Sequence, residues 1–228
     1  MKVAAIIPAA GKGKRLGAKT PKAFLKILGK PLLIHTLERL LKSYPFQEVL
    51  VAADPSKINE LKSLLKRYRL AGVRVVAGGK TRPESVRNAV LALGGTSDWV
   101  LIHDAARPFV GTRLTHDILA ASKKTGAAIC ALEATATVKK ADRVSMLIRE
   151  TLDRRTIYLA QTPQVFKKSL LTSRYKTLGD KALSATDEAA LFDGTKVKVK
   201  IVPGNERNLK VTTPGDLDLF KFYFGKKG

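Results

Sequence analysis

The sequence predicts an α/β protein with a Rossmann-like, doubly wound and mostly parallel sheet. Two observations carry this prediction. Short apolar runs recur along the first 130 residues, and amphipathic segments of helical period separate them. Alternating strands and helices are typical of a parallel sheet with helices on both faces. We expect residues 1–228 to form a single domain.

The individual elements follow from the apolar runs and from prolines that suit the first turn of a helix. The predicted strands are VAAIIP at 3–8, EVLVAAD at 48–54, VRVVAG at 73–78, DWVLIHD at 98–104 and AAICALE at 127–133. The predicted helices cover residues 31–41, 55–69, 83–93 and 112–124. Later in the chain we expect helices from about 167 and over 186–192, a strand over 197–203 at the edge of the sheet, and a closing helix over 214–223.

Residues 134–159 interrupt the alternation. They are polar, β-branched and charged, and they have no helical period. We therefore expect a protruding β-hairpin arm. Such an arm cannot bury its own surface, and a second subunit is the simplest element that could pack against it. The sequence therefore predicts a homodimer.

The charge of the chain points to an anionic partner. Its 42 Lys and Arg against 19 Asp and Glu give a formal charge of +23. Nucleic acid and phosphorylated metabolites both fit, and lysine-rich surfaces of heat-adapted proteins imply no partner at all. The basic residues are spread along the chain and only 6% of residues are aromatic, which disfavours nucleic acid. A basic nucleic-acid-binding regulator remains an alternative.

Cysteine content and hydropathy predict the compartment. Cys130 is the single cysteine and lies in the apolar run AAICAL, so we expect a buried thiol, no disulfide within the chain and a reducing cytoplasm. The apolar runs are too short for a signal peptide or a membrane span. These features predict a cytoplasmic protein without a membrane partner.

A glycine- and lysine-rich loop, PAAGKGKRLGAKTPKAF at 8–24, follows the first predicted strand. Ligands of open α/β sheets bind at such strand ends. A Walker A loop has one residue fewer between its glycines, and a dinucleotide fingerprint has GxGxxG where this loop has GxGxxxG at Gly11, Gly13 and Gly17. Small residues followed by the cations Arg15 and Lys22 instead favour the triphosphate loop of a nucleotidyltransferase.

Blocks along the whole chain resemble the 2-C-methyl-D-erythritol 4-phosphate cytidylyltransferases of the non-mevalonate isoprenoid pathway. The blocks are IPAAGKGKRLGAKTPK at 7–22, GGKTRPESVRNAV at 78–90, VLIHDAARPFV at 100–110, TATVKKAD at 135–142, LDRRTIYLAQTPQVF at 152–166, ATDEAALFD at 185–193 and NLKVTTPGDL at 208–217. The resemblance implies a nucleotidyltransferase fold, transfer of CMP from CTP to 2-C-methyl-D-erythritol 4-phosphate with release of pyrophosphate, and Mg²⁺ as cofactor.

The resemblance also implies the site residues. Negative charge builds on the transferred group and the departing pyrophosphate, so cations are needed, and Arg15 and Lys22 match the family's two catalytic cations. Arg154 in the arm and Lys210 would aim the attacking phosphate. Asp104 would hold the metal and substrate hydroxyls. The other implied substrate-positioning residues are Arg107, Thr137, Thr162 and Thr186. The implied CTP-binding residues are Pro8, Ala9, Ala10, Gly11, Gly13, Gly79, Arg82, Ser85 and Ala105.

Two positions depart from the family pattern, and one related activity competes. Ala23 stands where the family often has Gln, and Lys80 stands where it often has an acidic or small polar residue, which bears on base selectivity. A ribitol 5-phosphate cytidylyltransferase would share the fold, the loop and the CTP site. The IPAAG opening and the NLKVTTPGDL ending favour methylerythritol phosphate.

The remaining titratable candidates have plainer interpretations. We expect His35, on an apolar helix face, and His116, on an exposed helix, to be structural. His103 is expected at most to support Asp104, without contacting the substrate itself. The pair at 187–188 is expected to begin a helix, where carboxylates favour the N-terminal dipole. No cluster has the spacing of a zinc site.

Overall fold

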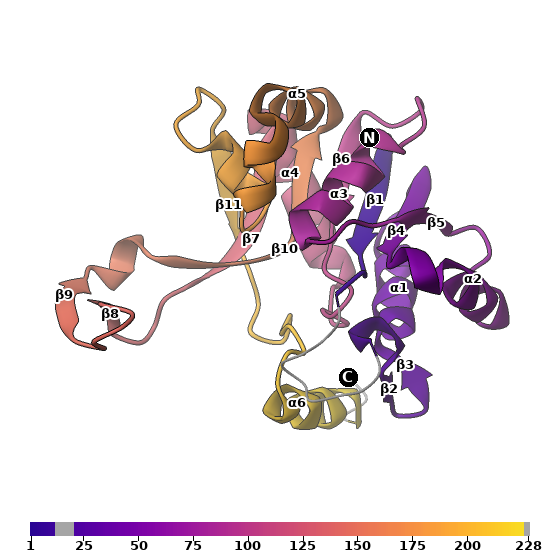
Figure 1. The fold of residues 1–228 in the computed structure, drawn as a ribbon, viewed down its shortest axis with the longest axis horizontal. Coiled ribbons are helices and arrows are strands. Elements are labelled where there is room, and N and C mark those ends of the chain that lie inside the picture. Colours follow the sequence, from indigo (N-terminus) through magenta and orange to yellow (C-terminus); the bar gives the residue numbers. More distant parts are fainter. Residues whose placement is uncertain (12–20, 226–228) are drawn as a thin grey trace.

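The computed structural model describes residues 1–11 and 21–225, and a seven-stranded sheet lies at the centre of these residues (Figure 1). The strand order is β11-β7-β10-β6-β1-β4-β5. Every neighbouring pair is parallel except those that β10 makes with β6 and β7. The strands are β1 (Val3–Pro8), β4 (Glu48–Ala53), β5 (Arg74–Ala77), β6 (Trp99–Ile102), β7 (Ala127–Glu133), β10 (Tyr158–Lys167) and β11 (Val199–Pro203). The predicted α/β class is confirmed.

Helices cover both faces of the sheet, as the alternation predicted. The helices are α1 (Leu32–Ser43), α2 (Ile58–Arg67), α3 (Arg82–Leu91), α4 (Thr112–Thr125), α5 (Lys168–Leu178) and α6 (Pro214–Gly225). In β1, Val3 and Ile7 pack in one buried cluster with α1, α2 and α4, whereas Ile6 packs in another with α3 and α5. Because successive side chains of a strand face opposite sides, a continuous apolar run is buried on both faces.

Helix α6 packs against α1 beside the small hairpin of β2 (Lys26–Ile27) and β3 (Lys30–Pro31), near one end of the sheet (Figure 1). Phe220 of α6 joins a third cluster with Leu32 and Val211. His35 lies in this contact, with its Nε2 2.9 Å from the Ile27 carbonyl oxygen and its ring against Phe220. The structural interpretation of His35 is therefore confirmed.

Strand β10 is the main element that the sequence pattern missed. No strand is predicted over 160–166, yet this segment runs antiparallel between β7 and β6. Its polar residues Gln161, Thr162 and Gln164 hide the apolar pattern of a buried strand. Pro163, which follows a cis peptide bond, cannot donate to a neighbouring strand, and the register shifts between Ala160 and Gln164.

The segment after α5 also differs from its prediction. Instead of a helix over 186–192, the chain forms a 3₁₀ turn, η5 (Gly179–Ser184), and a second short one, η6 (Ala189–Phe192). The Asp187 carboxylate accepts the Ala190 N–H and caps η6. Gly194, with φ of 69°, follows two residues after its end. The prediction of a longer helix was wrong, although a carboxylate does cap the short one.

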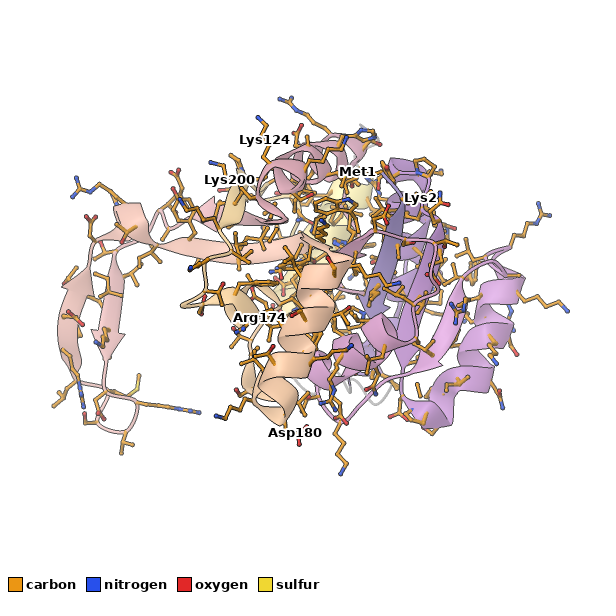
Figure 2. All side chains as sticks on the ribbon, turned by 90° about the horizontal axis from the view of Figure 1, so that it is seen from above. Met1, Lys2, Lys124, Arg174, Asp180 and Lys200 are labelled. Atoms are coloured by element: carbon orange, nitrogen blue, oxygen red, sulfur yellow. The ribbon has the colours of Figure 1, made fainter. Side chains whose placement is uncertain are left out.

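The predicted arm is present. Strands β8 (Val138–Ala141) and β9 (Ile148–Leu152) pair antiparallel and stand well apart from the sheet layers (Figures 1 and 2). The tip exposes Val144, Met146 and Leu147. Whether a second subunit covers this apolar tip stays a prediction.

Two further expectations concern Cys130 and hydropathy. The Cys130 thiol is buried and donates to the Pro163 carbonyl oxygen at 3.3 Å. Within residues 1–11 and 21–225, no helix is both long enough and apolar enough to cross a bilayer.

Candidate functional site

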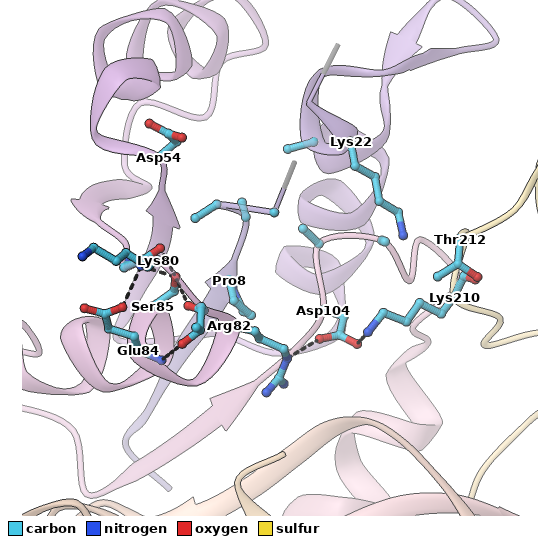
Figure 3. Close-up of a pocket in the computed structure, with 18 of the residues that line it drawn as sticks. Pro8, Lys22, Asp54, Lys80, Arg82, Glu84, Ser85, Asp104, Lys210 and Thr212 are labelled. Atoms are coloured by element: carbon cyan, nitrogen blue, oxygen red, sulfur yellow. Dashed lines mark hydrogen bonds and ion pairs between the residues drawn. The ribbon is translucent and has the colours of Figure 1, made fainter. Parts of the chain in front are cut away.

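A cavity of about 660 Å³ opens where parallel strands end (Figure 3). Its walls come from the segments after β1, β4, β5 and β6, from η2 (Lys22–Phe24), and from the segment that precedes α6. The described part of its lining consists of Pro8, Ala9, Ala10, Gly11, Lys22, Ala23, Asp54, Pro55, Gly79, Lys80, Thr81, Arg82, Glu84, Ser85, Asp104, Ala105, Ala106, Lys210 and Thr212. The carboxyl ends of the strands therefore form the site, as expected for an open α/β sheet.

Most of the predicted site residues meet in this cavity. Those in the lining are Pro8, Ala9, Ala10, Gly11, Lys22, Gly79, Arg82, Ser85, Asp104, Ala105 and Lys210. Gly13 and Arg15 lie outside the described residues. The predicted residues that are described but absent from the lining are Arg107, Thr137, Arg154, Thr162 and Thr186. The cavity thus gathers the predicted nucleotide side of the site together with Lys210.

Asp104, which lines the cavity, is the centre of a cluster of cations. Lys210 Nζ lies 2.7 Å from its Oδ2, Arg82 Nε donates to its Oδ1 at 3.1 Å, and Arg107 Nε lies 3.6 Å from Oδ2. Burial acts to raise the pKa of this carboxyl, but Arg82, Lys210 and Arg107 together hold the pKa well below its usual range. Lys22 extends into the same cavity from another wall (Figure 3). Asp104 is therefore a firmly ionised carboxylate among several cations.

A buried hydrogen-bond chain orients Asp104 from behind. The Thr162 hydroxyl accepts the Asp104 N–H at 3.0 Å and lies 3.1 Å from His103 Nδ1, while His103 Nε2 lies 2.9 Å from the Arg107 carbonyl oxygen. Burial lowers the pKa of His103 to about 4, so the ring is neutral at pH 7. A neutral ring with its proton on Nε2 satisfies all three contacts. Thr162 and His103 thus support the turn that carries Asp104.

Asn208 attaches the segment of Lys210 to the sheet, and sequence reasoning missed it. Its Nδ2 donates to the Thr162 carbonyl oxygen at 2.8 Å and to Gln161 Oε1 at 3.2 Å, and its own carbonyl oxygen accepts from Arg107 Nη1 at 2.7 Å. The side chain is buried. Its position two residues before Lys210, in one of the blocks that carry the family resemblance, was the available signal.

The turn between β5 and α3 is held by its own side chains. Gly79 N–H donates to Ser85 Oγ at 3.0 Å, Ser85 Oγ donates to the Thr81 carbonyl oxygen at 2.8 Å, and Lys80 N–H donates to Glu84 Oε2 at 2.7 Å. A Cβ on Gly79 would lie 2.2 Å from Glu84 Cγ, so only glycine fits without a shift. This turn is a preformed part of the cavity wall.

Glu188 lies behind the cavity and was assigned only a helix-start role from the sequence. Both of its carboxylate oxygens accept from Arg82 Nη1, at 3.0 and 3.1 Å, and the side chain is 1% exposed. Burial raises its pKa to about 7, although Arg82 acts in the opposite direction. A single carboxylate at this position has no periodic signal in the sequence, so only the folded chain shows its contact with Arg82.

The remaining predicted residues lie away from the cavity lining. Arg154 and Thr137 are exposed on the arm, where Arg154 Nη1 donates to the Thr135 carbonyl oxygen at 2.6 Å. The arm projects away from the strand ends that form the cavity (Figure 1). Thr186 is exposed in the segment before η6.

The described residues contain no group of three or more His, Cys, Asp or Glu side chains that could hold a metal ion on their own. Asp104 is nevertheless a hard oxygen ligand at the cavity surface. One carboxylate combined with substrate phosphates is the usual way in which proteins hold Mg²⁺. The donor set therefore fits a cation that arrives with a triphosphate.

Comparisons with known proteins agree with this geometry. A model of the family described as 2-C-methyl-D-erythritol 4-phosphate cytidylyltransferase matches residues 3–226. A protein of that name from Syntrophus aciditrophicus (strain SB) is 38% identical over 228 residues, which cover 99% of this chain and 97% of the relative.

Solved structures are similar over the same length. A 4-diphosphocytidyl-2C-methyl-D-erythritol synthase from Anaerococcus prevotii DSM 20548 superposes with a TM-score of 0.85 at 30% identity, covering 99% of each chain. A 2-C-methyl-D-erythritol 4-phosphate cytidylyltransferase from Thermus thermophilus has a TM-score of 0.81 at 33% identity, covering 99% of this chain and 100% of the other. The chain therefore belongs to the 2-C-methyl-D-erythritol 4-phosphate cytidylyltransferase family.

Proposed function

We propose that this protein transfers CMP from CTP to 2-C-methyl-D-erythritol 4-phosphate, giving 4-diphosphocytidyl-2-C-methyl-D-erythritol and pyrophosphate. One observation carries the proposal: Lys22, Arg82 and Lys210 converge with Asp104 on a cavity large enough for a nucleotide, in a chain that matches the family over residues 3–226. The family membership supports the identity of both substrates.

The reaction is an in-line displacement at phosphorus. A phosphate oxygen of the alcohol phosphate attacks the α-phosphorus of CTP, the bond to the bridging oxygen breaks, and pyrophosphate leaves with the bonding electrons. Positioned cations stabilise the charge that develops, and no protein nucleophile is needed. We assign this role to Lys22 and to Arg15.

We assign nucleotide binding to the segments after β1 and β5. Small side chains at 8–11 leave room for phosphates to approach the backbone. The turn at Gly79, which a hydrogen bond to Ser85 fixes, suits recognition of the edge of a pyrimidine. Lys80, a departure from the family pattern, lines the same cavity. Ala23, the other departure, also lines the cavity and is buried, and we assign an effect on base selectivity to Lys80 only.

We assign the alcohol phosphate to the side of the cavity that carries Lys210, with a hydroxyl contact from Thr186. The buried Thr162 hydroxyl, which accepts the Asp104 N–H and lies 3.1 Å from His103 Nδ1, would act through Asp104. Arg154 and Thr137 would complete this side, yet both lie on an arm that projects away from its own cavity. We therefore propose a homodimer in which each arm supplies these two residues to the other subunit. The exposed apolar tip of the arm supports this assignment.

Mg²⁺ would be held by Asp104 together with phosphate oxygens of CTP, and when bound it neutralises charge on the triphosphate. Asp104 suits this task because its neighbours keep it ionised. We place the reaction in the cytoplasm, where the buried thiol of Cys130 would remain reduced.

The test is pyrophosphate release by the purified protein with magnesium and CTP, offering each alcohol phosphate in turn. Release with methylerythritol phosphate is expected. Release with ribitol 5-phosphate only would move the assignment to the rival cytidylyltransferase. Binding to duplex DNA at physiological salt that is tighter than binding to CTP with magnesium would favour the nucleic-acid alternative instead.

A further inference from the structure

Arg82 is held between two carboxylates. Asp104 lines the cavity, and Glu188 is buried behind the lining. Its Nε donates to Asp104 Oδ1 at 3.1 Å, and its Nη1 contacts both oxygens of Glu188 at 3.0 and 3.1 Å. Asp104 in turn contacts Lys210 at 2.7 Å (Figure 3). The result is a row of alternating charges that runs from Lys210 on the cavity surface to Glu188 in the interior.

Glu188 is outside the cavity lining, so it acts on the site only through other residues. Its segment is anchored independently. Asp187 accepts from Gln164 Nε2 at 2.8 Å, and the Leu191 carbonyl oxygen accepts from Arg174 Nε at 2.7 Å. Glu188 therefore offers Arg82 a fixed, buried acceptor.

The arrangement decides how Arg82 meets Asp104. Guanidinium groups favour bidentate contact with a carboxylate. If Glu188 did not occupy Nη1, Arg82 would be free to turn its whole fork onto Asp104, because a buried guanidinium left without its acceptor is costly. Glu188 thus limits Arg82 to one hydrogen bond with Asp104 and leaves the other carboxylate oxygen, Oδ2, facing Lys210.

We propose that Glu188 is a positioning residue for the transfer reaction, and that it acts by holding Arg82 in the orientation that presents Asp104 to the substrates. This proposal rests on the proposed function. It also links the nucleotide side of the cavity to the segment that carries Thr186, since Glu188 follows Thr186 by two residues.

The test is steady-state kinetics of Glu188→Gln at pH 8. We expect kcat to fall about ten- to a hundredfold, as for other residues that orient a ligand-binding group. We expect KM for CTP to stay within about threefold of the wild type, because the cavity loses no positive charge. The split between kcat and KM separates positioning from general damage to the fold.

The chain offers a matched control in Asp180→Asn. Asp180 pairs with Arg87 at 3.1 Å, which joins the same helix α3 to η5, but this pair does not touch Asp104. Asp180 lies at the outer surface (Figure 2), and exposed pairs contribute little to stability. Both kcat and KM of this variant should match the wild type.

A second control tests the route through Arg82. In an Arg82→Gln background, Glu188→Gln should lower kcat no further, because the residue it acts through is gone. Losses that multiply in the double variant would overturn the proposal, as would a wild-type kcat for Glu188→Gln alone.

If circular dichroism shows that Glu188→Gln does not fold, Glu188→Asp is the second variant. It keeps the negative charge but has a shorter side chain that does not reach Arg82 as well. Its kcat should fall with KM retained, and an unchanged kcat would overturn the proposal.

Wild-type protein assayed beside the variants separates the two proposals. No pyrophosphate release by the wild type with any alcohol phosphate overturns the proposed function. An active wild type with an equally active Glu188→Gln variant overturns only the positioning role.

Discussion

Replacing Glu188 with glutamine should make the protein lose more stability on acidification than the wild type loses over the same pH range. The reason is that two buried groups titrate with opposite effects. Glu188 has a pKa raised by burial to about 7, and His103 has a pKa lowered by burial to about 4. Glutamine removes the first titration and leaves the second.

The sign of each contribution follows from proton binding. The folded state binds the Glu188 proton more tightly than the unfolded chain, with its ordinary pKa of 4.5, so stability is gained as the pH falls through 7. His103 does the reverse, because its ordinary pKa is 6.5, and stability is lost as the pH falls from 6.5 towards 4. Between pH 7.5 and 5 each effect amounts to about 2 kcal/mol, and in the wild type they oppose each other.

Urea unfolding at pH 7.5, 6 and 5, followed by circular dichroism, measures the free energy of unfolding directly. The Glu188→Gln variant should lose about 2 kcal/mol from pH 7.5 to 5. Burial lowers the pKa of His35 as well, which adds the same loss to the wild type and to the variant and leaves the difference between them unchanged. Asp180→Asn should follow the wild type, because Asp180 lies outside this cluster.

Parallel stability curves for the wild type and Glu188→Gln would refute this reasoning. They would mean that Glu188 stays ionised in the folded protein down to pH 5. In that case Arg82 would outweigh burial in setting the pKa of Glu188.

Three further predictions concern the site. Lys22→Ala should raise the barrier by about 4 kcal/mol, seen as a kcat lower by several decades, and an unchanged rate would remove its assigned role. Arg154→Ala should be inactive as a dimer, but mixing it with Lys22→Ala should restore about a quarter of the activity if each site takes its arm from the other subunit. A fully active monomer in sedimentation would contradict that. Thr162→Val should cost about 2 kcal/mol or more in urea unfolding, because Asp104 N–H and His103 Nδ1 lose their partner, whereas Thr162→Ser should not.

Much of the fold was predictable because parallel strands and their helices leave strong local patterns. Each predicted strand before residue 134 is present, and the convergence of Lys22 and Asp104 follows from their positions after or near strand ends. Strand β10 left no such pattern. Its buried positions are filled by polar residues that serve the site, such as Thr162, so its sequence reflects function more than burial.

The supporting residues were harder to predict than the cavity residues. Glu188 contacts Arg82 across 106 residues of sequence, and Asn208 contacts Thr162 across 46, so both contacts exist only after folding. A buried Glu and a buried Asn look like surface residues when only composition and period are considered. The sequence blocks that resemble the family include Glu188 and Asn208, but they do not indicate which residues these two contact.

The arm continues directly from the ladder between β7 and β10. Tyr158 is paired with Glu133, and the Ala134 N–H still donates to the Ile157 carbonyl oxygen at 3.0 Å before the two chains separate. A short turn could therefore close the ladder at this point without altering the register of the sheet. The arm is in this sense a long hairpin insertion in the ladder, and the register of the sheet does not depend on the length of its tip.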